Sequence, residues 1–297
     1  MHVVVTGSSG LVGTDLVRAL RDRGDRVTRL VRSPTSEPDT AHWDPAAGHL
    51  EPGLFDGVDA VVHLASEGIG ERRWTTEEKR RIRESRTQGT GLLARALAGR
   101  VSKPARLVSA SAVGIYGDRG DAVLTEESSL GQGFMAGLCR EWEAAARPAE
   151  DAGIAVTYLR SGVILAGHGG LLKRLLLPFK LGLGGRMGSG RQYISWIALR
   201  DEIAAILHLL DGELTGPVNV TAPNPVTNAE FAKLLGRALR RPAVLPTPLL
   251  PVKVRYGSQL VQELMLEGQR VMPARLDPAF SCEHPDLDGA LRAVLEP

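Results

Sequence analysis

The chain has 297 residues, of which 43% are hydrophobic and 24% are charged, and its formal net charge is +2. This length suits a nucleotide-binding domain with a modest second lobe, and the composition is that of an ordinary globular protein. The small net charge gives no general reason to expect nucleic acid or an anionic membrane as partner. We therefore expect a small-molecule substrate, and we leave open whether the chain forms a homodimer.

The cysteines and the first residues indicate in which cellular compartment the protein is expected. Cys139 and Cys282 lack the spacing of metal ligands, so no metal site is predicted. The first expected strand begins at residue 2, which leaves no room for a signal peptide. No apolar run reaches the roughly twenty residues that span a bilayer. We expect a cytoplasmic protein that does not bind membranes.

The first residues predict a strand, a glycine-rich turn and a helix. Residues 2–5 are mostly β-branched, and Thr6-Gly7-Ser8-Ser9-Gly10-Leu11-Val12-Gly13 leads into a helix to about residue 23. Unpaired N–H groups at the positive end of a helix dipole can hold a pyrophosphate. Gly7 suits the tight turn, Gly10 a close approach to phosphates, and Gly13 close packing of helix on strand. The flanking strand and helix favour this dinucleotide site over a chance turn with three glycines.

The end of the second predicted strand, residues 26–31, indicates which dinucleotide binds. Arg32 follows this strand nineteen residues after Gly13, Arg29 is nearby, and no Asp or Glu lies between Val27 and Thr35. At this place an acidic residue would hold the ribose 2′-hydroxyl, whereas arginine accommodates a 2′-phosphate. The pattern favours NADP over NAD. The alternative is a surface arginine without a ligand.

The next segments combine an expected loop with a buried strand. Residues 33–55 are rich in Pro, Gly and Asp, so we expect a loop with at most a short excursion. Residues 59–65 are almost continuously apolar, as in a buried parallel strand, and Leu64 and Ala65 at its end would leave room for the cofactor. His63 lies inside this strand without a visible partner, so a structural role is favoured over a catalytic one.

A helix over residues 75–98 is predicted by the capping box of Thr75 and Glu78. The basic residues from 79 to 86 are mostly expected on a solvated face. Arg86 differs, because it falls within the apolar stripe that contains Ile82 and Leu93. An inward arginine either meets the cofactor or substrate, or runs its stem along the core while its head finds water. Both alternatives stay open.

The rest of the chain predicts further strands and a second lobe. We expect a strand at 106–112 with Ser109 and Ser111, a helix at about 134–150 and a strand at 154–160. Residues 167–190 are glycine-rich and basic, which suits a mobile substrate loop or a flexible connection, with Lys180 or Arg191 as anion-holding groups. Residues 194–197 and 201–210 are expected to return to the sheet, followed by a strand at 217–220. Helices are expected to begin at about 227, 257 and 285.

This order of motifs resembles the extended short-chain dehydrogenase/reductases. The resemblance rests on Thr6-Gly7-x-x-Gly10-x-x-Gly13, His63-Leu64-Ala65 and Ser109-Ala110-Ser111. More narrowly, the chain is similar to an NAD-dependent epimerase/dehydratase-like subgroup with a DUF1731 carboxyl-terminal segment. Matching stretches include residues 72–74, 109–114, 142–145, 178–185, 221–231 and 266–271. Members of that subgroup resemble NADP-binding proteins, which agrees with Arg32.

The resemblance breaks at the chemistry. Family members usually use a serine with a Y-x-x-x-K pair, whose tyrosine exchanges a proton with the substrate oxygen. Here Phe134 and Leu138 occupy the positions of the tyrosine and lysine, and neither can move a proton. Arg86 stands where the family usually has an active-site asparagine. Ser111 remains at the serine position as a catalytic or a structural hydroxyl, and Tyr116 is the best substitute acid, with packing as its alternative.

These observations predict an α/β fold with a Rossmann-type doubly wound parallel sheet and a smaller carboxyl-terminal substrate lobe. The dinucleotide domain is expected over 1–165 with 194–220 returning to it, and the substrate lobe over 166–193 and 221–297. We expect an NADP-dependent oxidoreductase or epimerase-like enzyme; the alternatives are a dinucleotide-binding sensor without turnover and, more weakly, a nucleic-acid binder. Ser111 and Tyr116 are the candidate catalytic residues, and the cofactor site gathers Thr6, Gly7, Ser9, Gly10, Leu11, Val12, Gly13, Val31, Arg32, Leu64, Ala65, Arg86 and Ser109.

Overall fold

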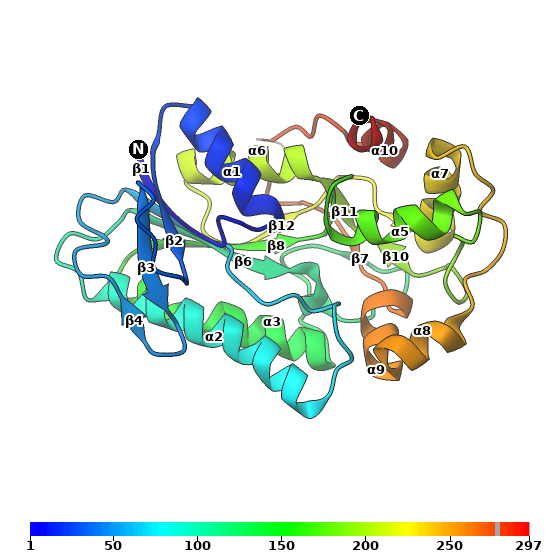
Figure 1. Cartoon of the computed structure of the whole chain (residues 1–297), viewed down its shortest axis with the longest axis horizontal. Coiled ribbons are helices and arrows are strands. Elements are labelled where there is room, and N and C mark those ends of the chain that lie inside the picture. The colour runs from blue at the N-terminus through cyan, green and yellow to red at the C-terminus, as the bar shows by residue number, and fades with distance from the viewer. Residues whose placement is uncertain (277–279, 297) are drawn as a thin grey trace.

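A central sheet organises the chain in the computed structural model, which describes residues 1–276 and 280–296 (Figure 1). It contains eight strands in the spatial order β12-β8-β6-β5-β1-β2-β3-β4. All neighbours are parallel except β3 and β4, which pair antiparallel. The bounds are β1 His2–Thr6, β2 Arg26–Val31, β3 Thr40–Asp44, β4 His49–Leu50, β5 Ala60–His63, β6 Arg106–Ala112, β8 Ala155–Ser161 and β12 Gly216–Val220.

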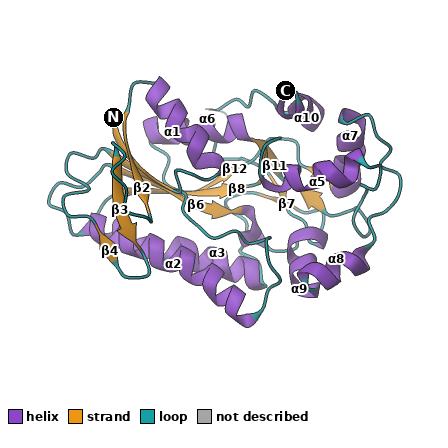
Figure 2. Cartoon of the chain, viewed as in Figure 1, coloured by secondary structure: helices purple, strands orange, loops and turns teal. Residues whose placement is uncertain are grey.

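Helices cover both faces of this sheet, as Figure 2 shows. Helices α1 (Leu11–Asp22) and α6 (Leu199–Asp211) bury Leu16, Leu20 and Ile206 on one face. Helices α2 (Thr76–Ala98), α3 (Phe134–Ala144) and α4 (Arg147–Asp151) cover the other, where Leu93 and Leu97 are buried. Strand order reverses between the neighbours β1 and β5, and ligands bind at such switch points in open α/β sheets. The predicted doubly wound Rossmann-type fold is confirmed.

The segment 33–55, expected to be a loop with at most a short excursion, contains a full strand of the central sheet. Its residues 40–44 form β3, which pairs with β2 in parallel register from Arg29 opposite Thr40. Alternation is visible here, because Ala41 and Trp43 are buried while their neighbours are not. The surrounding Pro, Gly and Asp residues belong to the turns on either side, and they hid a five-residue strand between them.

Two other expectations need correction. The helix expected over 134–150 is interrupted after Ala144, and α4 begins anew at Arg147 with Pro148 in its first turn, where proline is tolerated. Residues 193–198 do not join the large sheet: β10 (Tyr193–Ile194) pairs with β13 (Val226–Thr227), and β11 (Trp196–Ala198) pairs with β9 (Val163–Leu165). Of the segment 194–220, β12 joins the central sheet and α6 packs on its face.

The carboxyl-terminal half adds elements beyond the edge strand β12 (Figure 1). The glycine-rich segment 167–190 was expected to be a loop, but Gly170–Lys180 forms α5, which buries Leu172 and Phe179. Leucines at helical spacing outweigh the flanking glycines there. The further elements of this half are α7 (Asn228–Ala238), α8 (Leu249–Tyr256), α9 (Ser258–Val261), the π-helix η2 (Gln262–Leu266), β14 (Arg270–Val271) and α10 (Leu287–Leu295). Two short elements lie earlier in the chain, η1 (Val113–Tyr116) and β7 (Val123–Leu124), and β7 pairs with β14. In the described part of the chain, no helix combines the length and apolarity that crossing a bilayer needs.

Candidate dinucleotide site at the carboxyl edge of the sheet

The glycine turn between β1 and α1 has the geometry that its sequence predicts. Gly7 has φ of +66°, and a Cβ there would lie 2.8 Å from the backbone nitrogen of Ala65. A Cβ on Gly13 would lie 2.1 Å from the Gly7 carbonyl oxygen, so only glycine lets α1 approach the turn. No side chain caps α1, and its first turn has no acidic residue. The N–H groups of that turn, at Leu11, Val12 and Gly13, remain without intrahelical partners, as at any helix start.

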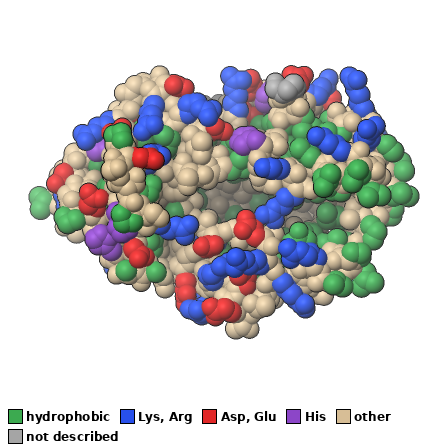
Figure 3. Space-filling view, viewed as in Figure 1, with side chains coloured by type: hydrophobic (Ala, Val, Ile, Leu, Met, Phe, Trp, Pro, Cys, Tyr) green, Lys and Arg blue, Asp and Glu red, His purple; other side chains and the backbone are tan. Residues whose placement is uncertain are grey.

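A cavity of about 740 Å³ opens directly above this turn. It lies between the glycine turn, the ends of β2 and β5, the start of the segment after β3, and α2. Figure 3 shows this face of the molecule hollowed across its middle, with Lys and Arg side chains along the edges. Seven of the predicted cofactor residues line the cavity: Gly7, Ser9, Gly10, Val31, Arg32, Leu64 and Ala65. Its volume lies within the roughly 300–1,000 Å³ typical of cofactor sites.

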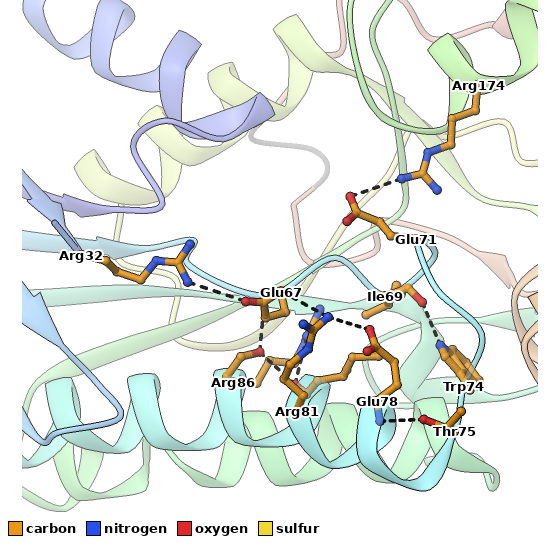
Figure 4. A network of polar contacts seen from close by, with 12 residues as sticks. Arg32, Glu67, Ile69, Glu71, Trp74, Thr75, Glu78, Arg81, Arg86 and Arg174 are labelled. Atoms are coloured by element: carbon orange, nitrogen blue, oxygen red, sulfur yellow. Dashed lines mark hydrogen bonds and ion pairs between the residues drawn. The ribbon is translucent and has the colours of Figure 1, made fainter.

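Charged side chains meet at the rim of this cavity. The Arg32 side chain is 76% exposed, and its Nη1 lies 3.6 Å from Glu67 Oε1. Arg81 on α2 lies on the other side of the same carboxylate, with Nη2 3.9 Å from Oε2 (Figure 4). Both ion pairs are long and partly solvated, so each is weak, and Arg81 is held more closely by Glu78, to which its Nη2 donates at 2.9 Å. Arg29 is engaged elsewhere, because its Nη2 donates to Glu37 at 2.6 Å.

His63 belongs to a buried hydrogen-bonded chain and not to the cavity lining. Thr6 Oγ1 accepts the backbone N–H groups of Leu64 and Ala65, so its own hydrogen is free to donate to His63 Nδ1 at 2.7 Å. His63 Nε2 then donates to Thr90 Oγ1 at 2.9 Å. Complete burial lowers the pKa of His63 to about 4, which keeps the ring neutral. This arrangement supports the structural role expected for His63, and it gives Thr6 the role of tying β1 to the end of β5.

The two candidate catalytic hydroxyls lie in a buried polar network at the ends of β6 and β8. Ser111 Oγ donates to Glu143 Oε1 at 2.7 Å, and the same carboxylate pairs with Arg160 at 2.8 Å. Tyr116 is fully buried; its hydroxyl donates to Asn219 Oδ1 at 2.7 Å and accepts from Arg160 at 3.0 Å. Burial raises the pKa of Tyr116. Because both hydrogen-bond partners of this hydroxyl lie inside the protein, the structure favours a packing role for Tyr116 over the role of substitute acid.

The remaining predicted positions lie apart from the cavity lining. Ser109 is buried, and its hydroxyl has no partner among the described residues. Arg86 is 5% exposed and stacks over the Trp142 ring at 4.8 Å, so it is directed inward as the apolar stripe predicts. Lys180 and Arg191 are exposed and lie outside the lining.

Phe134 and Leu138 are the residues that the family resemblance sets in place of the usual tyrosine and lysine, and Lys79 and Arg83 also lie over the Phe134 ring. Leu138 is fully buried, and the Phe134 ring contacts the Trp74 ring at a centroid distance of 4.8 Å. Neither the Phe134 nor the Leu138 side chain can exchange a proton. Among the described residues, no group of three His, Cys, Asp or Glu side chains could hold a metal ion.

Several residues of the cavity lining were not predicted from the sequence, among them Trp43, Arg81 and Glu67. Trp43 lines the cavity because β3, which was expected to be a loop, brings it there. Arg81 was included in a solvated basic run, yet its helical position places it at the rim. Glu67 follows β5 in a segment without a recognisable motif. The alternation of buried and partly exposed residues in β3 was a sequence signal for Trp43. The positions of Arg81 and Glu67 depend on how α2 and the segment after β5 lie relative to each other.

An eight-stranded, mostly parallel sheet with a glycine turn at its carboxyl edge defines a Rossmann-type α/β protein. The family model for the NAD dependent epimerase/dehydratase family matches residues 3–220. The chain belongs to this family. That match ends at β12, so the resemblance of the carboxyl-terminal segment to DUF1731 stays a prediction.

Individual relatives extend the likeness to the whole chain. Epimerase family protein Mb2239 of Mycobacterium bovis is 43% identical over 97% of this chain and 96% of its own length. Epimerase family protein YfhF of Bacillus subtilis is 33% identical over 99% and 98%. The crystal structure of human epimerase family protein SDR39U1 with NADPH is 37% identical, covers 99% of both chains and has a TM-score of 0.91.

Proposed function

We propose that this protein binds NADP and is an NADP-dependent oxidoreductase or epimerase-like enzyme that acts on a small carbonyl or sugar-like substrate. One observation carries the cofactor choice: Arg32 lines the same cavity as the glycine turn and is largely exposed. An arginine there suits the 2′-phosphate that distinguishes NADP from NAD. The NADPH in the human relative's structure supports the same choice.

The cofactor site would divide its work along the cavity. Gly7, Ser9 and Gly10, with the free N–H groups of Leu11, Val12 and Gly13, would hold the pyrophosphate at the positive end of α1. Val31 and Arg32 would contact the adenosine half, and Leu64 and Ala65 would line the path toward β6. Thr6 and Ser109 would shape this edge from below without contacting the ligand.

NADP, when bound, supplies hydride transfer, and the chain's own residues must orient the substrate. Ser111 is the proposed catalytic hydroxyl. Because its hydrogen is committed to Glu143, its lone pairs can accept a hydrogen bond from a substrate hydroxyl. The Glu143–Arg160 pair would keep this hydroxyl in place. We further propose the two-lobe division, with substrate between the lobes, and a cytoplasmic location.

A second candidate function is a dinucleotide-binding sensor without turnover. The observation that favours it is the packing of Phe134 and Leu138, which leaves no tyrosine and lysine where family members usually have them. Such a protein would bind the cofactor as tightly as an enzyme does. It would not transfer hydride.

The test is a titration of the purified protein with NADPH and NADH, followed through nicotinamide fluorescence. We expect NADPH to bind more tightly, and Arg32→Ala to weaken NADPH by roughly tenfold to a hundredfold, since a charge-assisted contact is worth about 1.5–3 kcal/mol. Arg26→Ala, at the opposite end of β2, is the matched control and should change neither affinity. Equal affinities for both cofactors, or none for either, would contradict the proposal.

Turnover separates the two candidate functions once binding is established. Oxidation of bound NADPH by any member of a panel of small aldehydes, ketones and keto sugars supports the enzyme. Loss of that activity in Ser111→Ala, with NADPH affinity retained, supports the catalytic hydroxyl. Tight binding with no oxidation across the panel favours the sensor.

A further inference from the structure

Arg86 is a buried cation without a countercharge. Its side chain lies between α2 and α3, and the residue is 5% exposed. Among the described residues no carboxylate lies within 4.0 Å of its guanidinium, although buried charges are normally paired. The one carboxylate whose charge raises the pKa of Arg86 among the described residues is Glu67, and Glu67 is already shared between Arg32 and Arg81. The described part of the chain therefore leaves this positive charge without a partner carboxylate.

The hydrogen bonds of Arg86 are incomplete as well. Nη1 donates to the Ile82 carbonyl at 3.2 Å, one turn back along α2. Nε and Nη2 have no partner within the described chain, and neither nitrogen is sealed from solvent. The Trp142 ring stacks on the guanidinium at 4.8 Å and fixes its plane. A fixed guanidinium edge with two adjacent free donors matches the two oxygens of a carboxylate.

The neighbouring charges decide which anion fits. Arg160 is the other buried arginine near Cys139, and Glu143 neutralises it at 2.8 Å. One positive charge is therefore left over at Arg86. A carboxylate brings a single negative charge, whereas a phosphate brings about 1.5 to 2 and would need a further cation. Burial lowers the pKa of Arg86 to about 10, so the group stays charged at neutral pH and favours an anion that relieves its desolvation.

Arg86 does not itself line the cavity, but Glu67, whose charge acts on the Arg86 guanidinium, does. Ser85 and Gln88 on the same turn of α2 line the cavity, and Ser85 Oγ accepts the backbone N–H of Glu67 at 3.2 Å. Figure 4 shows Arg32, Glu67, Arg81 and Arg86 in one neighbourhood between β2 and α2. We propose that Arg86 is a substrate-binding residue that receives a carboxylate group, so that the substrate of this protein is a carboxylic acid. This inference rests on the proposed function and specifies its substrate class.

The test uses oxalate as a small carboxylate probe and its neutral diamide, oxamide, as the matched control compound. Both are added to the full-length protein with and without NADPH, after NADPH binding has been measured on the same sample. Thermal unfolding reports binding. Tryptophan emission reports where the carboxylate binds, because a carboxylate on Arg86 alters the surroundings of Trp142. The variant Trp142→Phe should therefore abolish the emission change while the thermal shift persists.

The variants separate a binding role from a structural one. We expect oxalate, and not oxamide, to raise the melting temperature of the wild type. Arg86→Met should weaken the oxalate response by about tenfold or more while leaving the unliganded melting temperature equal or higher, since it removes an uncompensated buried charge. Arg86→Lys should retain part of the response. Arg83→Met, on an exposed residue of the same helix, should respond like the wild type.

Three results would overturn the inference: no oxalate response in protein that binds NADPH, an equal response in Arg86→Met, or a clear loss of stability in unliganded Arg86→Met. The first leaves the proposed NADP-binding function intact. Conversely, protein that does not bind NADPH but responds to oxalate through Arg86 contradicts the proposed function and retains the carboxylate site.

Discussion

Glu67 Oε1 lies 3.6 Å from Nη1 of Arg32 at the rim of the cavity, where the 2′-phosphate of NADP is proposed to bind. The carboxylate competes with that phosphate for the arginine and repels it. We expect Glu67→Gln to tighten NADPH binding by roughly twofold to fivefold, because exposed ion pairs are worth about 0.2–1 kcal/mol. Nicotinamide fluorescence titrations at low ionic strength measure the change.

NADH provides the internal comparison for this variant, because it lacks the phosphate and should bind as before. Glu71→Gln removes an exposed carboxylate that pairs with Arg174 instead, so it should leave both affinities unchanged. An equal gain for NADH and NADPH would show that Glu67 does not act through the 2′-phosphate.

Tyr116 offers a test of the buried network at the ends of β6 and β8. Its hydroxyl bridges Asn219 and Arg160, so Tyr116→Phe leaves both partners incompletely bonded. We expect the free energy of unfolding to fall by about 1–3 kcal/mol, with NADPH affinity unchanged. Urea unfolding and cofactor titration measure the two quantities. Tyr193→Phe is the control, since the described residues offer its hydroxyl no hydrogen bond and its ring contacts Arg270 instead. Unchanged stability of Tyr116→Phe would remove the basis for its structural role.

Glu202 predicts how stability depends on pH. Its carboxyl is 1% exposed, with Oε1 accepting from Ser161 at 2.6 Å and Oε2 unpartnered among the described residues. Burial raises the pKa of Glu202 from 4.5 to about 7. Between these values the folded protein holds a proton that the unfolded chain releases. The contribution of Glu202 to stability is therefore full below pH 4.5 and lost as the pH rises through 7.

Glu202→Gln imitates the protonated carboxyl at every pH. We expect it to exceed the wild type in unfolding free energy by about 1–3 kcal/mol at pH 8, with the difference shrinking toward pH 5. Urea unfolding at several pH values measures this. Glu213→Gln, at an exposed carboxyl just beyond α6, should show no such trend. A constant difference between the Glu202 variant and the wild type would exclude the titration as its cause.

The sequence alone determined the Rossmann-type fold, the glycine turn and the arginine that follows β2. These features are local: Gly7 needs a positive φ, Gly13 needs no Cβ, and Arg32 follows its strand directly. Each depends on residues close together in the chain, so spacing and residue type were sufficient. The inward direction of Arg86 also followed from helical periodicity.

The tertiary structure decided which polar groups meet. Glu67 lies between Arg32 and Arg81 because the segment that follows β5 brings it close to the residue after β2 and to α2. Tyr116 meets Asn219 from a strand 103 residues further along the chain, and Glu143 on α3 pairs with Arg160 on β8. Such contacts join residues far apart in sequence, and their energies depend on burial and distance, which no local pattern records.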